Sequence, residues 1–251
     1  MVSMLFEKVE GIILRTQDYG ETHKIVILLT KDRGKVGVIA RGAKKPKSRM
    51  AAVTQPFIHG MFLVQAGSNL GTLQQGEVLT SLRAIREDIV KTAYASYLAE
   101  LTDKLLDPKQ YDPFLFNQLM QIFLRIAEGE DPEILTIIYE LKAFQRAGFA
   151  PTVDKCVNCG SKEGPFSFSV AEGGLLCGRC RHLDPNAVSL SEKLTRILYL
   201  FSKVDIERIG SIEIKKENRL LLRQLMDAYY EKYGGYFLKS KRFLKQLDML
   251  K

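Results

Sequence analysis

Up to about residue 80, hydrophobic and polar positions alternate with a period of two, as in β-strands whose two faces differ. The alternation is clearest over residues 35–40. The pattern predicts five strands, at residues 9–17, 24–30, 35–41, 56–65 and 71–80, with Asp32-Arg33-Gly34 as a hairpin turn. Five short strands without a long helix between them predict a small closed barrel of the OB-fold type, and an SH3-like barrel is the alternative.

From about residue 84 onward, hydrophobic positions recur every three or four residues, which is the period of an α-helix. The first predicted helix buries Ile89, Ala93, Tyr97, Leu101 and Leu105. Further helices are expected to begin at Asp112, Asp131 and Ser191, because these residues suit helix N-caps. The chain is therefore expected to form a barrel domain over residues 1–82 and an all-α domain over residues 83–251.

The composition is that of a globular protein expected in the cytoplasm. No apolar run approaches the roughly 18 residues that span a bilayer. Charged residues interrupt the N-terminal segment, so no secretory leader and no membrane partner are expected. In that reducing compartment disulfides are rare, so closely spaced cysteines indicate a metal site.

The cysteines form two Cys-x-x-Cys pairs, Cys156 with Cys159 and Cys177 with Cys180, and seventeen residues separate the pairs. This spacing is typical of paired zinc knuckles. We expect one structural Zn²⁺ within residues 154–182, with an iron–sulfur cluster or metal-free thiols as alternatives. Four protein ligands leave no open position for a water, so the metal would support folding and not catalysis. The nearby His182 could replace a ligand, but it fits better as a solvated loop residue.

Most of the net charge of +8 falls in residues 31–49, where Asp32 is the only acidic residue. The basic residues there are Lys31, Arg33, Lys35, Arg41, Lys44, Lys45, Lys47 and Arg49, and Arg15 and Lys24 could extend the same surface. Such a block indicates a polyanionic partner. Nucleic acid is favoured over an acidic membrane surface, because the block joins predicted strands and lacks an amphipathic helical pattern. A solvated charged loop is the alternative.

The sequence lacks the motifs of familiar catalytic sites. A phosphate-binding P-loop would need glycine at positions 41 and 46, where Arg41 and Pro46 stand. There is no H-E-x-x-H or G-x-S-x-G motif, and three histidines offer little catalytic material. We therefore expect a nucleic-acid-binding protein that is not an enzyme. An RNA-binding zinc-containing factor and a protein-interaction scaffold would share this charge pattern and are kept as alternatives.

Several segments together resemble one family. They are residues 10–15 (EGIILR), 18–21 (DYGE), 40–49 (ARGAKKPKSR), 148–151 (GFAP), 173–177 (GGLLC) and 238–244 (LKSKRFL). Each segment alone is weak, but their joint occurrence across almost the whole chain is similar to the RecO family of bacterial recombination mediators.

The resemblance implies an OB-fold followed by a helical domain with the zinc segment. It also implies a nucleoid-associated bacterial protein that binds single- and double-stranded DNA and anneals complementary strands. With the partner RecR, such a protein helps to load RecA onto DNA covered by single-strand-binding protein. A second basic cluster then becomes a candidate contact for DNA or for the acidic C-terminal tail of single-strand-binding protein, with a solvated helix face as the alternative. Its residues are Lys239, Lys241, Arg242 and Lys245.

Overall fold

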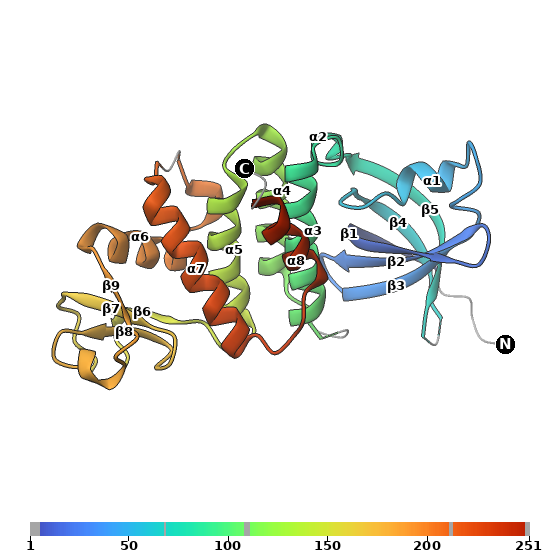
Figure 1. Cartoon of the computed structure of the whole chain (residues 1–251). Helices are drawn as coiled ribbons and strands as arrows, with labels where there is room; N and C mark the ends of the chain where they lie inside the picture. Colours follow the sequence, from blue (N-terminus) through green and yellow to red (C-terminus); the bar gives the residue numbers. More distant parts are fainter. Residues whose placement is uncertain (1–5, 68, 108–110, 211–212, 249–251) are drawn as a thin grey trace. The chain divides into compact units, whose positions relative to one another are not determined.

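The computed structural model describes residues 6–67, 69–107, 111–210 and 213–248 (Figure 1). These residues form two compact units. Unit 1 contains the described residues up to Pro132 together with those from Leu238 onward, and unit 2 runs from Glu133 to Phe237. The predicted domains, residues 1–82 and 83–251, divide the chain at a different place from these compact units. That each predicted domain folds independently stays a prediction.

Unit 1 is built around a closed five-stranded barrel (Figure 1). Its strands are β1 (Phe6–Tyr19), β2 (His23–Thr30), β3 (Gly34–Ala40), β4 (His59–Gln65) and β5 (Gly71–Thr80). They follow the order β1-β2-β3-β5-β4, and β3 pairs with β5 in parallel while the other pairs are antiparallel. A short helix, α1 (Arg49–Val53), lies between β3 and β4 in the chain. The predicted OB-fold barrel is confirmed.

The barrel core follows from the two-residue alternation of its strands. Val26 and Leu28 of β2 point into the core, as do Val38 and Ala40 of β3. Between these strands Gly34 has a φ of 68°, a conformation that glycine adopts without steric cost. The hairpin turn predicted at this position is therefore confirmed.

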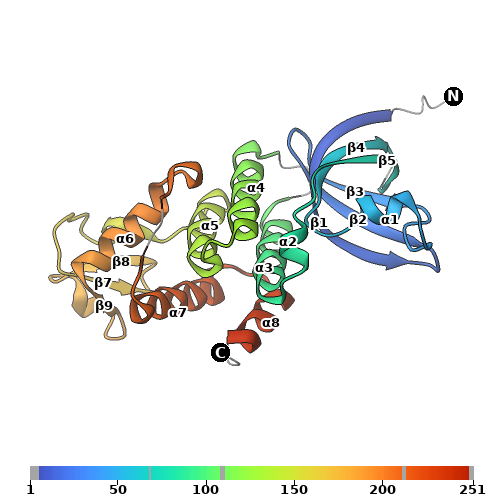
Figure 2. The ribbon, with the colours of Figure 1, turned by 90° about the horizontal axis from the view of Figure 1, so that it is seen from above.

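Four helices complete unit 1: α2 (Arg83–Arg86), α3 (Ile89–Leu105), α4 (Pro113–Glu128) and α8 (Lys239–Asp248). Helix α3 contacts β1, α2, α4 and α8. Asp112 caps α4 as predicted, because its side chain accepts the backbone N–H of Leu115. Glu100 of α3 caps α8, accepting the backbone N–H groups of Lys239 and Ser240 at 3.2 and 2.8 Å. Both views show α8 beside α3 (Figures 1 and 2).

Unit 2 combines helices with a small sheet. Its helices are α5 (Pro132–Arg146), α6 (Glu192–Lys203) and α7 (Lys216–Tyr233), and its strands are β6 (Thr152–Cys156), β7 (Phe166–Ser169), β8 (Gly174–Cys177) and β9 (Val188–Leu190). The sheet order is β6-β8-β7-β9. Two short 3₁₀ turns span Arg181–Leu183 and Ile206–Arg208. The four-cysteine insertion into a helical domain is confirmed, although the sequence did not reveal that the insertion is a sheet.

Aromatic residues and a buried ion pair hold unit 2 together. Phe144 of α5 stacks with Tyr230 of α7, with ring centroids 5.8 Å apart. The Tyr229 hydroxyl donates to the carbonyl oxygen of Phe149 at 2.8 Å. Arg223 of α7 approaches Glu140 of α5 at 2.7 Å, and the Glu140 side chain is 0% exposed.

Among the described residues, no helix combines the length and the apolar character that crossing a membrane requires.

Candidate nucleic-acid interface and metal centre

The four cysteines meet in the sheet of unit 2. Cys156 ends β6 and Cys177 ends β8, and each is followed by a turn that carries the second cysteine of its pair. In these turns Gly160 N–H donates to the carbonyl oxygen of Cys156, and Cys180 N–H donates to that of Cys177, both at 2.9 Å. The tight turns bring sulfurs from two distant segments together, and the four Sγ atoms lie within 4.8 Å of one another.

The surroundings of the sulfurs favour thiolates at two positions. Burial would raise the pKa of Cys156, but hydrogen bonds from the backbone N–H groups of Cys159, Cys177 and Asn158 outweigh it and lower the pKa to about 6. Burial likewise opposes ionisation of Cys177, whose pKa is nevertheless lowered by the N–H groups of Cys180 and Arg179. Backbone donors aimed at sulfur are typical of metal-binding knuckles.

The donor set fits a tetrahedral metal ion. Metal–sulfur distances of about 2.3 Å give sulfur–sulfur edges of roughly 3.8 Å in a tetrahedron. Cys159 Sγ and Cys177 Sγ are 3.6 Å apart. His182 is exposed, and its Nδ1 lies 2.8 Å from the carbonyl oxygen of Arg179, which is consistent with the expected loop residue. The cluster can therefore hold one metal ion with the four thiolates as ligands.

The basic block of residues 31–49 is divided between the two ends of β3. Lys31 and Arg33 lie in the turn before this strand, and residues 41–48 form a loop after it, here called the basic loop. The seven residues of β3 separate the two groups, which corresponds to about 20 Å in an extended strand. The block is therefore two groups of cations and not one.

Carboxylates already neutralise the cations at the turn end and beside it. Lys31 pairs with Glu10 at 3.1 Å, and Arg33 pairs with Glu7 at 3.1 Å. Two further predicted contacts share one acid on α3, Asp103, which lies 2.8 Å from Arg15 and 3.2 Å from Lys35.

The cations at the loop end are exposed, and four of them have no ion pair within the described residues. They are Arg41, Lys45, Lys47 and Arg49. Lys44 pairs with Asp18 at 2.7 Å. Lys24 is half-buried at the same end of the barrel, where it is opposite Asp18 and Ala40 in the strand registers.

The turn between β1 and β2 fastens the basic loop. The backbone N–H of Lys44 donates to the carbonyl oxygen of Thr22 at 2.9 Å, and that of Gly42 donates to Nδ1 of His23 at 3.0 Å. Sequence reasoning missed Thr22 and His23, since nothing in the spacing of these residues indicates contact with a loop that follows β3.

The outer face of β1, β2 and β3 runs from the paired cations to the basic loop. Val26 and Val38 point into the core, so Ile25 and Ile39, which are opposite each other, point outward. Ile25 is opposite Gln17 of β1, and the same face carries Arg15 and Tyr19. An apolar strip with cations at both ends can accept a chain that is both polyanionic and aromatic.

The second basic cluster lies on α8 and does not form a single solvent-facing group. Lys239, Arg242 and Lys245 are exposed. Lys241 is only 8% exposed, so an external anion has little access to it.

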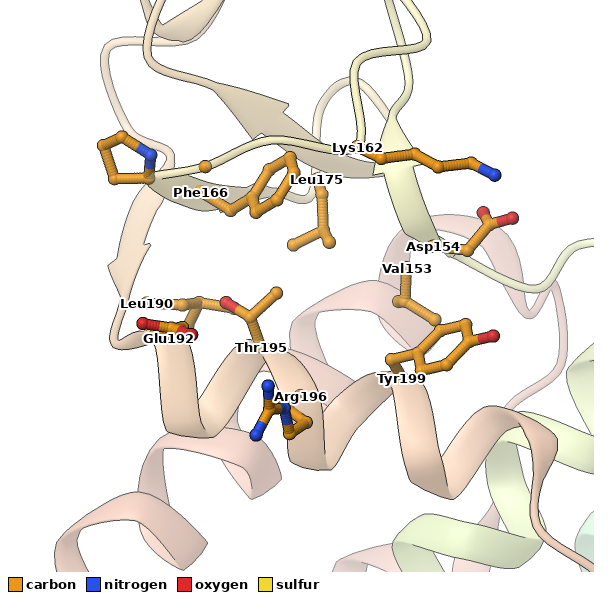
Figure 3. Close-up of a pocket in the computed structure, with 12 residues that line it drawn as sticks. Val153, Asp154, Lys162, Phe166, Leu175, Leu190, Glu192, Thr195, Arg196 and Tyr199 are labelled. Carbon is orange, nitrogen blue, oxygen red and sulfur yellow. The ribbon is translucent and has the colours of Figure 1, made fainter.

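Unit 2 also contains a cavity of about 720 Å³ between the sheet and α6. Figure 3 shows Val153 and Leu175 of the sheet facing Thr195 and Tyr199 of α6. Charges of both signs surround it, from Asp154, Lys162, Glu192 and Arg196. The cavity therefore favours no particular ligand charge.

Comparisons with known proteins agree with this architecture. The family model described as "Recombination protein O N terminal" matches residues 4–82, and the model described as "Recombination protein O C terminal" matches residues 86–242. A protein of Oceanobacillus iheyensis named "DNA repair protein RecO" is 56% identical over 244 residues, which cover 97% of this chain and 95% of the relative. The protein of the same name from Bacillus subtilis is 48% identical over 247 residues, covering 98% and 97% of the two chains. The chain therefore belongs to the RecO family of DNA repair proteins.

Proposed function

We propose that this protein is a recombination mediator that binds single- and double-stranded DNA and anneals complementary strands. With RecR, it helps to load RecA onto DNA covered by single-strand-binding protein. It acts in the cytoplasm on the bacterial nucleoid and has no catalytic step of its own. Membership of a DNA repair family supports a role in DNA repair for this activity.

The observation that carries the proposal is the group of unpaired cations on the basic loop and its neighbour α1, Arg41, Lys45, Lys47 and Arg49. Exposed cations that hold no carboxylate can exchange their water for phosphate oxygens without first breaking an ion pair. Each phosphate that they neutralise releases condensed counterions, so binding is independent of base sequence and weakens as salt rises. Such contacts bring strands together without recognising their base sequence, as annealing requires.

Zn²⁺ is the metal proposed for Cys156, Cys159, Cys177 and Cys180. With four thiolate ligands it would supply folding energy to the sheet of unit 2, and no position for a reacting water remains. In this proposal the four cysteines shape unit 2, and the cations of unit 1 contact DNA.

The salt dependence of binding tests the DNA interface. Replacing Arg41, Lys45, Lys47 and Arg49 together by alanine should reduce the slope of log affinity against log salt for single-stranded DNA by about 3, since each phosphate contact contributes about 0.7. The measurement is fluorescence anisotropy of a labelled oligonucleotide across a salt series. An unchanged slope would refute the assignment of DNA contacts to the basic loop.

An annealing assay tests the mediator function. Complementary strands are first covered with cognate single-strand-binding protein, and the protein should accelerate duplex formation from them. The four-residue loop variant serves as the matched control and should lose most of this acceleration. A protein that anneals bare strands but not covered ones would be a general basic DNA binder and not a mediator.

A further inference from the structure

Tyr19 occupies an unusual place on the surface of unit 1. It is the last residue of β1, pairs in register with His23, and is 48% exposed. Within the described residues, its hydroxyl has no hydrogen bond and its ring has no aromatic partner. A large aromatic side chain is thus left in solvent at the end of the barrel that carries the basic loop.

The cations of the basic loop lie beside this position. Asp18, the residue before Tyr19, pairs with Lys44 at 2.7 Å. Thr22, in the turn that follows Tyr19, accepts the backbone N–H of Lys44, and His23 accepts that of Gly42. Tyr19 is therefore held next to the basic loop by hydrogen bonds on both sides of it in the sequence.

The side chains beside Tyr19 on the outer face can contact the bases of a nucleic acid. Strand alternation places Gln17 and Tyr19 on the side of β1 that continues into Ile25 of β2 and Ile39 of β3. A strand whose phosphates follow the basic loop would have its bases directed at this apolar strip. Phosphate contacts alone do not favour single strands, because a duplex presents the same phosphate groups at a higher charge density.

We propose that Tyr19 is a stacking platform for an unpaired base, so that it strengthens the binding of single strands and not the binding of duplex DNA. The inference rests on the proposed function, which supplies the phosphate contacts beside it. A base inside a duplex has both faces covered by its neighbours, so only an unpaired base can stack on the ring. Cations of the basic loop hold the strand, and Tyr19 adds a contact that only an unpaired base can make.

Affinity for two kinds of strand separates stacking from charge. Tyr19→Ala should weaken binding of oligothymidine about five- to a hundred-fold, as expected for losing one stacked base. The same substitution should leave binding of an abasic deoxyribose-phosphate strand of equal length unchanged. Tyr19→Phe keeps the ring and should restore the oligothymidine affinity. Tyr199→Ala, at a tyrosine of similar exposure (44%) on α6, is the matched control and should change neither.

A fluorescence experiment observes the stacking directly. The sequence contains no tryptophan, so Tyr19→Trp makes a full-length protein with a single reporter at this position. Oligothymidine should quench its emission, whereas the abasic strand should bind, by anisotropy, without quenching it. Equal quenching by both strands, or none with either, would overturn the stacking role.

The outcomes distinguish this inference from the proposed function. If Tyr19→Ala leaves oligothymidine affinity intact while the four-residue loop variant loses its salt slope, the stacking role is wrong and the DNA interface stands. If neither variant changes binding, both are wrong. If Tyr19→Ala weakens oligothymidine and abasic strands equally, the residue only supports the loop, and the stacking role is again wrong.

Discussion

Nε of Arg15 on β1 donates a hydrogen bond of 2.8 Å to Oδ2 of Asp103 on α3. Lys35 of β3 approaches the other oxygen of the same carboxylate at 3.2 Å. One acid of a helix thus holds two cations that the sequence assigns to nucleic-acid binding, and it holds them against the barrel. The positive charge of this protein is therefore divided into cations that stabilise unit 1 and cations that are available to a partner.

Replacing Asp103 should destabilise unit 1 at neutral pH. Burial would raise the pKa of Asp103, but hydrogen bonding to Arg15 and the charge of Lys35 outweigh it and hold the pKa below its usual value. The stabilisation is therefore present above the unfolded-state pKa of about 3.9 and is lost as the pH falls through the lower folded-state value. Asp103→Asn should cost about 1–3 kcal/mol at pH 7, measured by urea unfolding. Asp32→Asn, at an exposed turn residue, is the control, and an equal cost for both changes would contradict this role.

The two ends of β3 should contribute unequally to DNA binding. Lys45→Gln combined with Arg49→Gln should reduce the salt slope for single-stranded DNA by about 1.4. Lys31→Gln combined with Arg33→Gln removes the same charge, but these residues already pair with Glu10 and Glu7. Their loss should change the slope by less than half as much. Equal slopes for the two double variants would show that the ion pairs open when DNA binds.

Metal removal should affect unit 2 before it affects DNA binding. Cys177→Ser should abolish stoichiometric zinc, measured by mass spectrometry of the purified protein, and should lower its thermal stability. Apparent zinc-binding energies of roughly 10–16 kcal/mol are as large as the stability of a whole domain. His182→Ser is the matched control and should keep both the metal and the stability. Full stability after chelation would contradict a structural role.

The slope of log affinity against log salt provides a second measurement for the Cys177→Ser variant. Because the cysteines are in unit 2 and the loop cations in unit 1, Cys177→Ser protein that remains soluble should keep the slope of the wild type. A slope reduced as far as in the loop variant would instead place the metal segment in the DNA interface.

The ion pair between Arg223 and Glu140 should matter more than the one between Arg223 and Asp227. Both carboxylates lie within 2.8 Å of the arginine, but Glu140 is 0% exposed and Asp227 is 17% exposed. Glu140→Ala would leave a buried cation without that partner and should cost about 3–5 kcal/mol in chemical unfolding. Asp227→Ala removes an i,i+4 pair at a more exposed position and should cost about 0.5 kcal/mol. Similar costs for the two changes would show that water reaches Glu140.

Local features of the fold could be predicted because their causes lie within a few residues. The alternation over residues 35–40 determines β3, and Asp112 and Ser191 cap the helices that follow them. The cysteine cluster could also be predicted, since a two-residue gap fixes the geometry of each knuckle. In these cases a short stretch of sequence contains the residues that determine the local geometry.

Other features depend on contacts between distant segments. The pairing of Lys35 with Asp103 joins residues from a strand and a helix, and nothing around Lys35 in the sequence identifies it as neutralised. The sheet around the cysteines was missed because its strands have three to five residues, too few for alternation to be recognised. The division of the basic block into two groups could have been predicted from the sequence, because a predicted strand separates the two groups. The sequence did not point to the stacking proposed for Tyr19, because a single exposed aromatic residue has no periodicity.

The contact between α3 and α8 has a consequence for folding during synthesis. Unit 1 includes α8, and Glu100 caps that helix, yet all of unit 2 lies between them in the chain. During synthesis the barrel and α3 leave the ribosome long before residues 239–248. The surface of α3 that contacts α8 therefore stays uncovered until α8 has emerged. A nascent chain at that stage is a natural client for chaperones that shield apolar surface, and unit 1 closes only after unit 2 has emerged.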